Sequence, residues 1–315
     1  MKSPSLCRQT VAVIDIGSNS IKLLVARRGL HGSVESVKAR TLDARISAGI
    51  SGAEPKLSEE SMTRGLGAIR ELIDEASGYS PTKTVLVATS AVRDAKNGSA
   101  FRDKVLKGTG KTIRVLSGDE EATLIGKGLL CDPALAQLSD FYVYDLGGGS
   151  LECLAFKGRK MKQALSLPLG CVRLTELLVK TPSEPFVAAA EVEAHVTKVL
   201  ESSGFRRDLG DQAITIGTGG TLTTIRAIRA AETDTTLERT KATITRDEIS
   251  ALLQQLGALP LEARQKVQGL AKSRADVFPT ALATFVAIAD LGAITRFEHS
   301  LYNLRWGLAA EALAL

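Results

Sequence analysis

Cysteine, histidine and aromatic residues are scarce in this chain. Its 315 residues include four cysteines and three histidines, scattered far apart and without a Cys-x-x-Cys pair. This spacing argues against a zinc site and a disulfide framework; it is typical of cytosolic thiols, so we expect a cytoplasmic location. Aromatic residues make up only 4% of the chain and are not interleaved with its basic clusters, which argues against stacking on nucleic acid.

Long apolar runs are also missing. No stretch approaches the ~20 apolar residues of a membrane helix, and residues 1–10 lack the apolar core of a signal peptide, so we expect neither a membrane partner nor secretion. The 44% hydrophobic content still suffices for buried cores, and the length suits about two domains. The net charge of +5 favours an anionic substrate or partner.

One acidic, glycine-containing turn occurs twice in the same register. The segment VIDIGSNS at 13–20 aligns with VYDLGGGS at 143–150. Apolar runs flank both, which predicts a β-hairpin with Asp15 or Asp145 at the end of its first strand. We expect glycine and asparagine to give the turn backbone positive φ, so that its N–H groups converge on phosphate oxygens. Two such turns predict a duplicated domain that holds one phosphorylated ligand from both sides.

A third glycine-rich segment predicts a further anion site. A short strand at 213–216 precedes the loop GTGGT at 217–221, and a helix follows at 222–231. Free N–H groups and the positive end of the helix dipole would face the ligand there. The glycine spacing matches neither a Walker loop nor a dinucleotide fingerprint.

Strands alternate with helices in both halves of the chain, which predicts an α/β fold. The second half begins at Phe141, so we expect one domain at 1–130 and another at 131–300, with a helix at 301–315 that could return to the first. In the first half we expect strands at 11–16, 21–27, 33–40, 84–88 and 112–116, and helices near 62–73, 98–106 and 118–130.

The last of these helices begins with two adjacent glutamates. Ser117 and Glu120 fit a capping box, in which the serine caps the helix and the glutamate returns to the serine N–H. Glu121 lies about 100° further around the helix and is free to face elsewhere. From the residues alone, Glu121 is either a functional group or a carboxylate that favours the helix N-terminus.

Six motifs follow one another in a characteristic order. They are the two turns, ATSAVR at 88–93 with Asn97, SGDEEA at 117–122, LGCV at 169–172 and GTGGT at 217–221. In this order they resemble the exopolyphosphatase/guanosine pentaphosphate phosphohydrolase (Ppx/GppA) family. The resemblance implies two ribonuclease-H-like domains of the actin/Hsp70/sugar-kinase superfold, with the active site in the cleft between them. It also implies release of terminal phosphate from inorganic polyphosphate or from pppGpp, with Mg²⁺, or Mn²⁺ as the alternative ion.

The resemblance also assigns roles to residues. It implies that Glu121 is the catalytic base, that Arg93 binds a phosphate, and that Asp145, Glu152 and Asp15 lie near the metal and the attacking water. An arginine fork, a metal and backbone N–H groups would neutralise the phosphoryl charge, and the base would orient the water. The remaining phosphate-binding residues implied are Ser18, Asn19, Ser20, Gly147, Gly148, Gly149, Ser150, Gly219, Gly220 and Thr221.

The chain also departs from the family pattern. Leu151 stands where the family usually has threonine, and SLYNLRWG at 300–307 replaces the more charged Ser-Asp-x-x-Leu-Arg-Glu-Gly. We find no sequence signature of the C-terminal histidine-aspartate (HD-type) domain of the long family members, so we expect a short two-domain member of the family. Besides polyphosphate hydrolysis, the sequence leaves open pppGpp hydrolysis, an ATP-dependent kinase of the same superfold, and a weakly active polyphosphate or alarmone sensor. It does not decide between a monomer and a homodimer.

Overall fold

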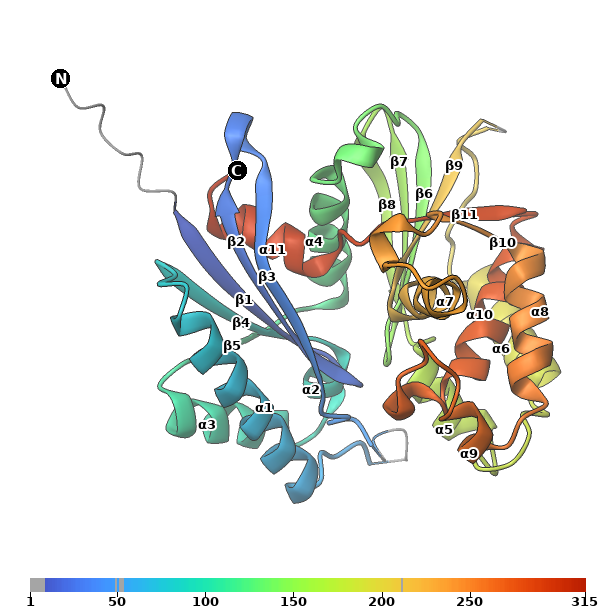
Figure 1. Ribbon diagram of the computed structural model, residues 1–315, viewed down its shortest axis with the longest axis horizontal. Helices are drawn as coiled ribbons and strands as arrows, with labels where there is room; N and C mark the ends of the chain where they lie inside the picture. Colours follow the sequence, from blue (N-terminus) through green and yellow to red (C-terminus); the bar gives the residue numbers. More distant parts are fainter. Residues whose placement is uncertain (1–8, 49, 51–53, 211) are drawn as a thin grey trace.

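The computed structural model describes residues 9–48, 50, 54–210 and 212–315. Two β-sheets stand side by side, each flanked by helices (Figure 1). No helix in the described ranges is long and apolar enough to cross a membrane.

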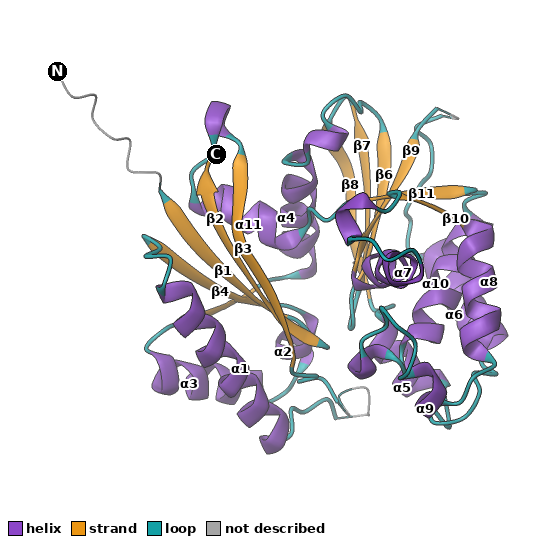
Figure 2. Ribbon diagram, in the orientation of Figure 1, coloured by secondary structure: helices purple, strands orange, loops and turns teal. Residues whose placement is uncertain are grey.

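The first sheet has the strand order β3-β2-β1-β4-β5. Strands β1, β2 and β3 pair antiparallel, whereas β4 and β5 run parallel to β1. Helices α1 and α3 cover its outer face, and α2 follows β4 (Figure 2). The elements are β1 (Thr10–Ile16), β2 (Ser20–Arg28), β3 (Val34–Asp43), α1 (Glu59–Ser77), β4 (Lys83–Ala88), α2 (Ser90–Asp94), α3 (Gly98–Thr109) and β5 (Ile113–Val115).

The second sheet has the order β10-β11-β9-β6-β7-β8, and its outer face packs on α6, α8 and α10. Strands β6, β7 and β8 form an antiparallel meander, with β9 parallel to β6. The elements are β6 (Phe141–Leu146), β7 (Leu151–Lys157), β8 (Lys160–Leu167), α5 (Cys171–Leu178), α6 (Ala189–Ser202), β9 (Ile214–Gly219), α7 (Gly220–Glu232), β10 (Thr243–Thr245), α8 (Arg246–Gly257), α9 (Leu261–Arg264), α10 (Phe278–Leu291) and β11 (Arg296–His299).

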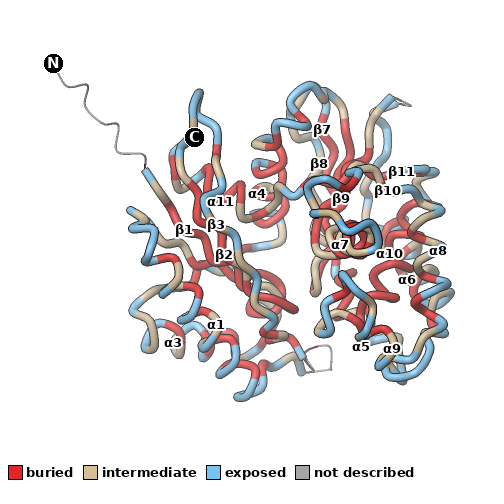
Figure 3. Tube along the Cα trace, viewed as in Figure 1, coloured by how far each residue is buried: buried red, intermediate tan, exposed pale blue. Residues whose placement is uncertain are grey.

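Two helices fill the space between the sheets. Helix α4 (Gly118–Leu130) packs against β7 and β8 of the second sheet, whereas α11 (Leu304–Ala312) packs against β1 and β2 of the first. Together they bury a central core that includes Leu129, Phe156 and Trp306, seen as the red interior between the sheets in Figure 3. Each helix thus lies on the sheet of the other half of the chain. The division of the chain near residue 130 stays a prediction.

The helices α4 and α11 approach so closely that their backbones touch. A Cβ atom at Gly307 would lie 1.9 Å from Leu124 O, and one at Gly128 would lie 2.0 Å from Asn303 O. Only glycine leaves room for such an approach. These two glycines therefore set the distance between the central helices.

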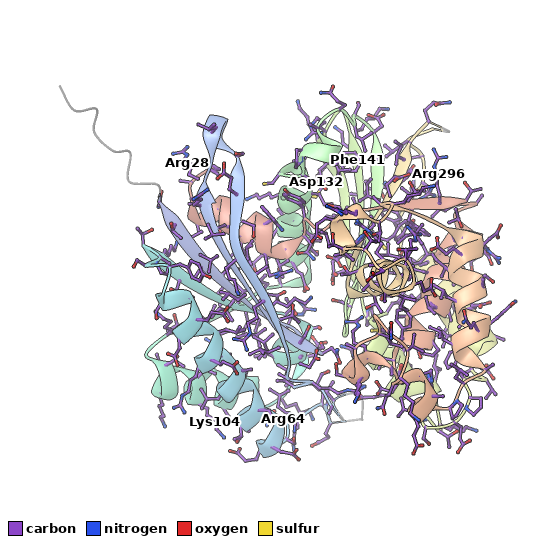
Figure 4. All side chains as sticks on the ribbon, in the orientation of Figure 1. Arg28, Arg64, Lys104, Asp132, Phe141 and Arg296 are labelled. Carbon is purple, nitrogen blue, oxygen red and sulfur yellow. The ribbon has the colours of Figure 1, made fainter. Side chains whose placement is uncertain are left out.

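Several basic side chains pair with carboxylates on the outer helices. Arg64 on α1 donates to Glu60 (2.6 Å), and Lys104 on α3 pairs with Glu59. Figure 4 labels Arg64 and Lys104 on these helices and Arg296 on β11, at the opposite edge of the molecule. These basic residues are therefore surface charge that is already paired, and they do not by themselves indicate an anionic ligand.

Candidate active site

One cavity brings most of the predicted site residues together. It has a volume of about 70 Å³ and opens to solvent, with room for at least one phosphate group. Arg93 and Thr221 are absent from its wall. Thr221 lies fully buried behind it. The predicted residues that line the cavity are Asp15, Ser18, Asn19, Ser20, Glu121, Asp145, Gly147, Gly148, Gly149, Ser150, Glu152, Gly219 and Gly220.

The two acidic turns are the hairpins that the sequence predicts. Each is closed by one backbone bond, from Gly17 N to Ser20 O (3.2 Å) in the first and from Gly147 N to Ser150 O (3.0 Å) in the second. Across the first hairpin Asp15 pairs with Lys22. At the same register of the second, Asp145 pairs with Glu152. The duplicated hairpins therefore differ in charge, because the first carries an acid and a base and the second carries two acids.

Helix α5 turns the N–H groups of the second hairpin toward the cleft. The backbone N–H groups of residues 171–173 donate to the carbonyl oxygens of Gly147 and Gly148, and Arg173 Nε donates to Gly149 O (2.9 Å). Because a trans peptide holds its N–H opposite its carbonyl, the N–H groups of residues 148–150 point away from α5. None of these three has a partner within the described ranges. Free N–H groups that converge in this way are suited to an anion.

The first turn is held in the same manner by the loop after β3. Arg45 N donates to Asn19 O (2.8 Å) and Ser47 N to Ser18 O (3.3 Å). Both polar atoms of the buried Asn19 side chain lack a partner within the described ranges. A buried amide with no partner is costly, so this side chain is suited to a ligand that would satisfy it.

The expectation of positive φ in these turns is wrong. Neither Gly17 nor Gly147–Gly149 nor Asn19 has a left-handed backbone. The glycines serve close approach instead, since a Cβ at Gly148 would lie 2.9 Å from Ser18 Cβ and one at Gly149 would lie 2.1 Å from Ser90 Oγ. The two turns therefore meet across the cleft with no room for side chains between them.

The third glycine segment also differs from its prediction. Strand β9 continues through Gly219, and α7 begins at Gly220 with no loop between them. Gly219 is the residue that needs left-handed backbone, with φ of 98°. A Cβ there would lie 2.7 Å from Asp145 Oδ1. The segment brings the start of α7 to the cleft wall, and its glycine makes space for Asp145.

Glu121 points into the cleft because its neighbour caps the helix. Ser117 Oγ accepts from Glu120 N (3.1 Å), and Glu120 Oε2 accepts from Ser117 N (2.8 Å), which confirms the capping box. Glu121 is 6% exposed and accepts a bond of 2.9 Å from Arg93 Nη1. Burial raises the pKa of Glu121 to about 7, against the opposing effect of Arg93. A carboxyl group with a pKa near neutral is suited to exchange protons.

Arg93 lies against the carboxylate rather than against the turns. Besides Glu121, its guanidinium donates to Leu116 O (3.2 Å) and to Asp94 Oδ1 (3.3 Å). The contacts give it a role in holding Glu121. Its role as a phosphate ligand stays a prediction.

Three further carboxylates surround the same space. Burial raises the pKa of Asp15, raises that of Asp145 to about 6, and raises that of Glu152 well above its usual value. Ser166 on β8 donates to Glu152 Oε1 (2.8 Å). Burial disfavours the charged form of all three carboxylates, and a bound cation would favour that form.

The donor set suits a hard divalent ion that is shared with a substrate. Within the described ranges, no group of three or more His, Cys, Asp or Glu side chains is placed to hold a metal by itself. Mg²⁺ is usually bound by one or two carboxylates together with water and substrate phosphates, not by an all-protein cage. The paired Asp145 and Glu152 fit that pattern of ligands.

Sequence reasoning missed three cationic residues of the cleft. Lys22 and Arg274 line the cavity, and the half-buried Arg305 lies close enough to influence the pKa of Asp15 and Asp145. Burial lowers the pKa of Lys22. The period of two in a strand places Lys22 on the same face as Ser20, so the alternation along β2 was a signal for it. No local pattern marks Arg274 or Arg305.

The two departures from the family pattern lie differently: Leu151 is away from the cavity wall, whereas the segment 300–307 contributes Asn303 and Leu304 to it. Leu151 is fully buried in the core of the second sheet. At 300–307, Trp306 stacks on Tyr302 with ring centroids 3.9 Å apart, and Leu301 is partly exposed. Leu151 therefore puts no apolar group into the cavity, and its position gives no reason to expect a weakened enzyme.

We expect Leu151→Thr to lower the melting temperature and leave activity per folded molecule unchanged. The substitution buries an unpaired hydroxyl group among apolar side chains, at a cost of about 1–3 kcal/mol. Thermal unfolding and phosphate release on one preparation would measure both effects. Leu177→Thr is the control, because Leu177 is 55% exposed and surface changes usually stay within about 0.5 kcal/mol. A more active Leu151→Thr variant would contradict this assignment.

Comparison with known proteins gives a consistent set of relatives. A model of the Ppx/GppA phosphatase family matches residues 10–314. The guanosine-5'-triphosphate,3'-diphosphate pyrophosphatase of Vibrio parahaemolyticus is 31% identical over 305 residues, which are 95% of this chain and 58% of the relative. The enzyme of the same name from Vibrio vulnificus is 29% identical, over 96% of this chain and 59% of its own length. The chain thus spans less than two thirds of these curated relatives.

Two solved structures share the fold. A Ppx/GppA family member from Aquifex aeolicus has a TM-score of 0.77 at 24% identity and covers 97% of this chain and 98% of its own. An exopolyphosphatase from Cytophaga hutchinsonii has a TM-score of 0.86 at 22% identity, with the same coverage. They confirm the expected α/β fold of the actin/Hsp70/sugar-kinase type.

Proposed function

Since the chain belongs to the Ppx/GppA phosphatase family, we propose that it is a phosphoanhydride hydrolase that releases terminal orthophosphate from inorganic polyphosphate. One observation carries the proposal. A buried glutamate with a pKa near neutral, Glu121, faces a small cavity that is also lined by the two glycine-containing turns. Such a cavity has room for a phosphoryl group and a water molecule.

In the proposed reaction the terminal phosphate lies in the cavity that both turns line. Its oxygens accept from the backbone N–H groups of residues 148–150 and from the first turn, and Lys22 and Arg274 offset its charge. Glu121 accepts the proton of a water molecule that attacks phosphorus in line with the leaving oxygen. Arg93 holds the glutamate in place through its bond of 2.9 Å. Fixed donors of this kind stabilise charge that develops in the transition state.

We include Mg²⁺, or Mn²⁺ in its place, in this proposal. Asp145 and Glu152 would hold the ion together with substrate oxygens, and Asp15 would face it from the first hairpin. A bound ion of this kind withdraws charge from the phosphoryl oxygens. The raised pKa values of the three carboxylates are in accord with a site that takes up positive charge.

Hydrolysis of pppGpp is the second candidate, and the names of the Vibrio relatives favour it. The scarcity of apolar groups in the cavity wall favours polyphosphate, because only Ile125, Leu146 and Leu304 could contact a base. The sensor hypothesis loses its support with the placement of Leu151 in the core.

The test is phosphate release from short polyphosphate, long polyphosphate, pppGpp and ATP, each with Mg²⁺. We expect kcat/KM on a polyphosphate to exceed that on ATP by at least ~10²-fold, a difference of roughly 2.7 kcal/mol in transition-state binding. The chelator EDTA should abolish release. A preference for pppGpp would select the second candidate, and release from ATP alone would defeat both.

A further inference from the structure

A chain of ion pairs connects the two halves of the protein beside the cleft. Asp94, at the end of α2 in the first half, accepts a hydrogen bond from Arg173 on α5 in the second half. Asp94 also accepts from Arg93 Nε at 3.3 Å, and Arg93 Nη1 donates to Glu121 at 2.9 Å. The pairs therefore run without a break from α5 to the proposed base.

Arg173, at the far end of these linked ion pairs, contacts the second glycine turn at residues 147–150. Arg173 Nε donates to Gly149 O (2.9 Å), and its backbone N–H donates to Gly148 O (3.2 Å). One arginine thus contacts the turn that would hold the phosphate and the carboxylate that anchors Arg93. A movement of the turn would reach Glu121 through only three side chains.

The side chains in these linked ion pairs are less exposed to solvent than those of ordinary surface pairs. The side chains of Arg93, Asp94 and Arg173 are 24%, 32% and 25% exposed, and that of Glu121 is 8% exposed. Exposed pairs are worth little, but removing one partner of a partly buried pair leaves the other charge poorly solvated. Each link therefore depends on its neighbours.

The pair between Asp94 and Arg173 must break when the cleft opens, because its partners belong to different halves. The residues that line the cavity come from both halves of the chain, and proteins with two lobes commonly open and close such a cleft around their ligand. We propose that Asp94 and Arg173 form a closure contact that positions Glu121 for reaction. Both are positioning residues, and the inference rests on the proposed function.

The contact has a distinct kinetic signature. Asp94→Asn keeps the shape of the side chain and leaves the bond from Arg173 to Gly149 intact. We expect it to lower kcat on polyphosphate by about 10-fold, because a displaced base reacts more slowly, and to change KM by less than about threefold. Arg173→Gln should lower kcat at least as much. The double variant should be no slower than the slower single variant, as expected for residues that act through one contact.

Arg114→Gln is the matched control. Arg114 bridges Glu120 and Glu311 at 2.9 Å each, next to the same end of α4, but has no bond to Arg93 or Glu121. It should keep the wild-type kcat. Melting temperatures within a few degrees of wild type would show that all variants are folded. Additive losses in the double variant, or a loss confined to KM, would overturn the closure contact.

A second measurement separates this inference from the proposed function. Small-angle X-ray scattering with tripolyphosphate, at a concentration that saturates binding, should give a smaller radius of gyration for wild type than for Asp94→Asn. Equal radii would overturn the closure contact even if the enzyme is active. The wild type could instead contract on tripolyphosphate more than Asp94→Asn does and yet release phosphate from none of the substrates. That result would defeat the proposed function and retain the closure contact.

Discussion

Glu121→Gln should lower the rate of phosphate release by at least ~10²-fold while substrate binding and folding stay close to wild type. Glutamine keeps the size of the side chain and can still accept from Arg93, but it cannot take a proton from water. The loss follows from the usual contribution of a general base. Initial rates of phosphate release and calorimetric titration with tripolyphosphate would measure the two properties separately.

Glu120→Gln is the control for this variant. Glu120 is exposed and serves the capping box, where glutamine also functions, so its activity should remain within about twofold of wild type. Equal losses in both variants would contradict the separate roles. The pH profile gives a further check, because Glu121 has a pKa raised to about 7. Below that pH the carboxyl group is protonated, and kcat/KM should fall about tenfold per pH unit.

Gly307→Ala should destabilise the protein strongly. The added methyl carbon would lie 1.9 Å from Leu124 O and 3.1 Å from Gly128 N, so α11 and α4 must move apart at the centre of the molecule. Overpacking typically costs 1–3 kcal/mol and sometimes more. We expect about 3 kcal/mol or more here, because the obstacle is backbone that no rotamer change can move. Calorimetry should show a melting temperature lowered by roughly 6–12 °C.

A Gly→Ala substitution at an exposed helix position should instead stabilise the protein. Gly67 lies in α1, is exposed, and would place a Cβ atom near no other group. Because glycine within a helix is less favourable than alanine by about 1 kcal/mol, Gly67→Ala should raise the melting temperature. If Gly307→Ala proved as stable as Gly67→Ala, the backbone contact between the central helices would be disproved.

The parts of the site that depend on local chain geometry were predictable from the sequence. The hairpins at Asp15 and Asp145 follow from apolar runs around a glycine turn, and the capping box at Ser117 freed Glu121 to face inward. These features depend on residues a few positions apart.

The parts that depend on tertiary contacts were not predictable. From the propensity of glycine, the sequence predicted positive φ in the turns. The glycines are needed for another reason, because the facing turn leaves no room for a side chain. Leu151 follows directly after the second glycine turn, and only the packing of β7 shows that it faces the core. The pair of Asp94 and Arg173 joins residues 79 positions apart, and no sequence pattern relates them. Tertiary packing overrides local propensity in each case.

The position of α11 has a consequence for the order in which the chain can fold. Strands β1 and β2 are synthesised long before residues 304–312, which cover one face of their sheet. During synthesis, that apolar face stays uncovered until residues 304–312 have been made, since domains fold as their residues become available. Contacts between residues so distant in sequence also form slowly. The nascent first half should therefore be the stage at which this protein is most prone to aggregate and most dependent on chaperones.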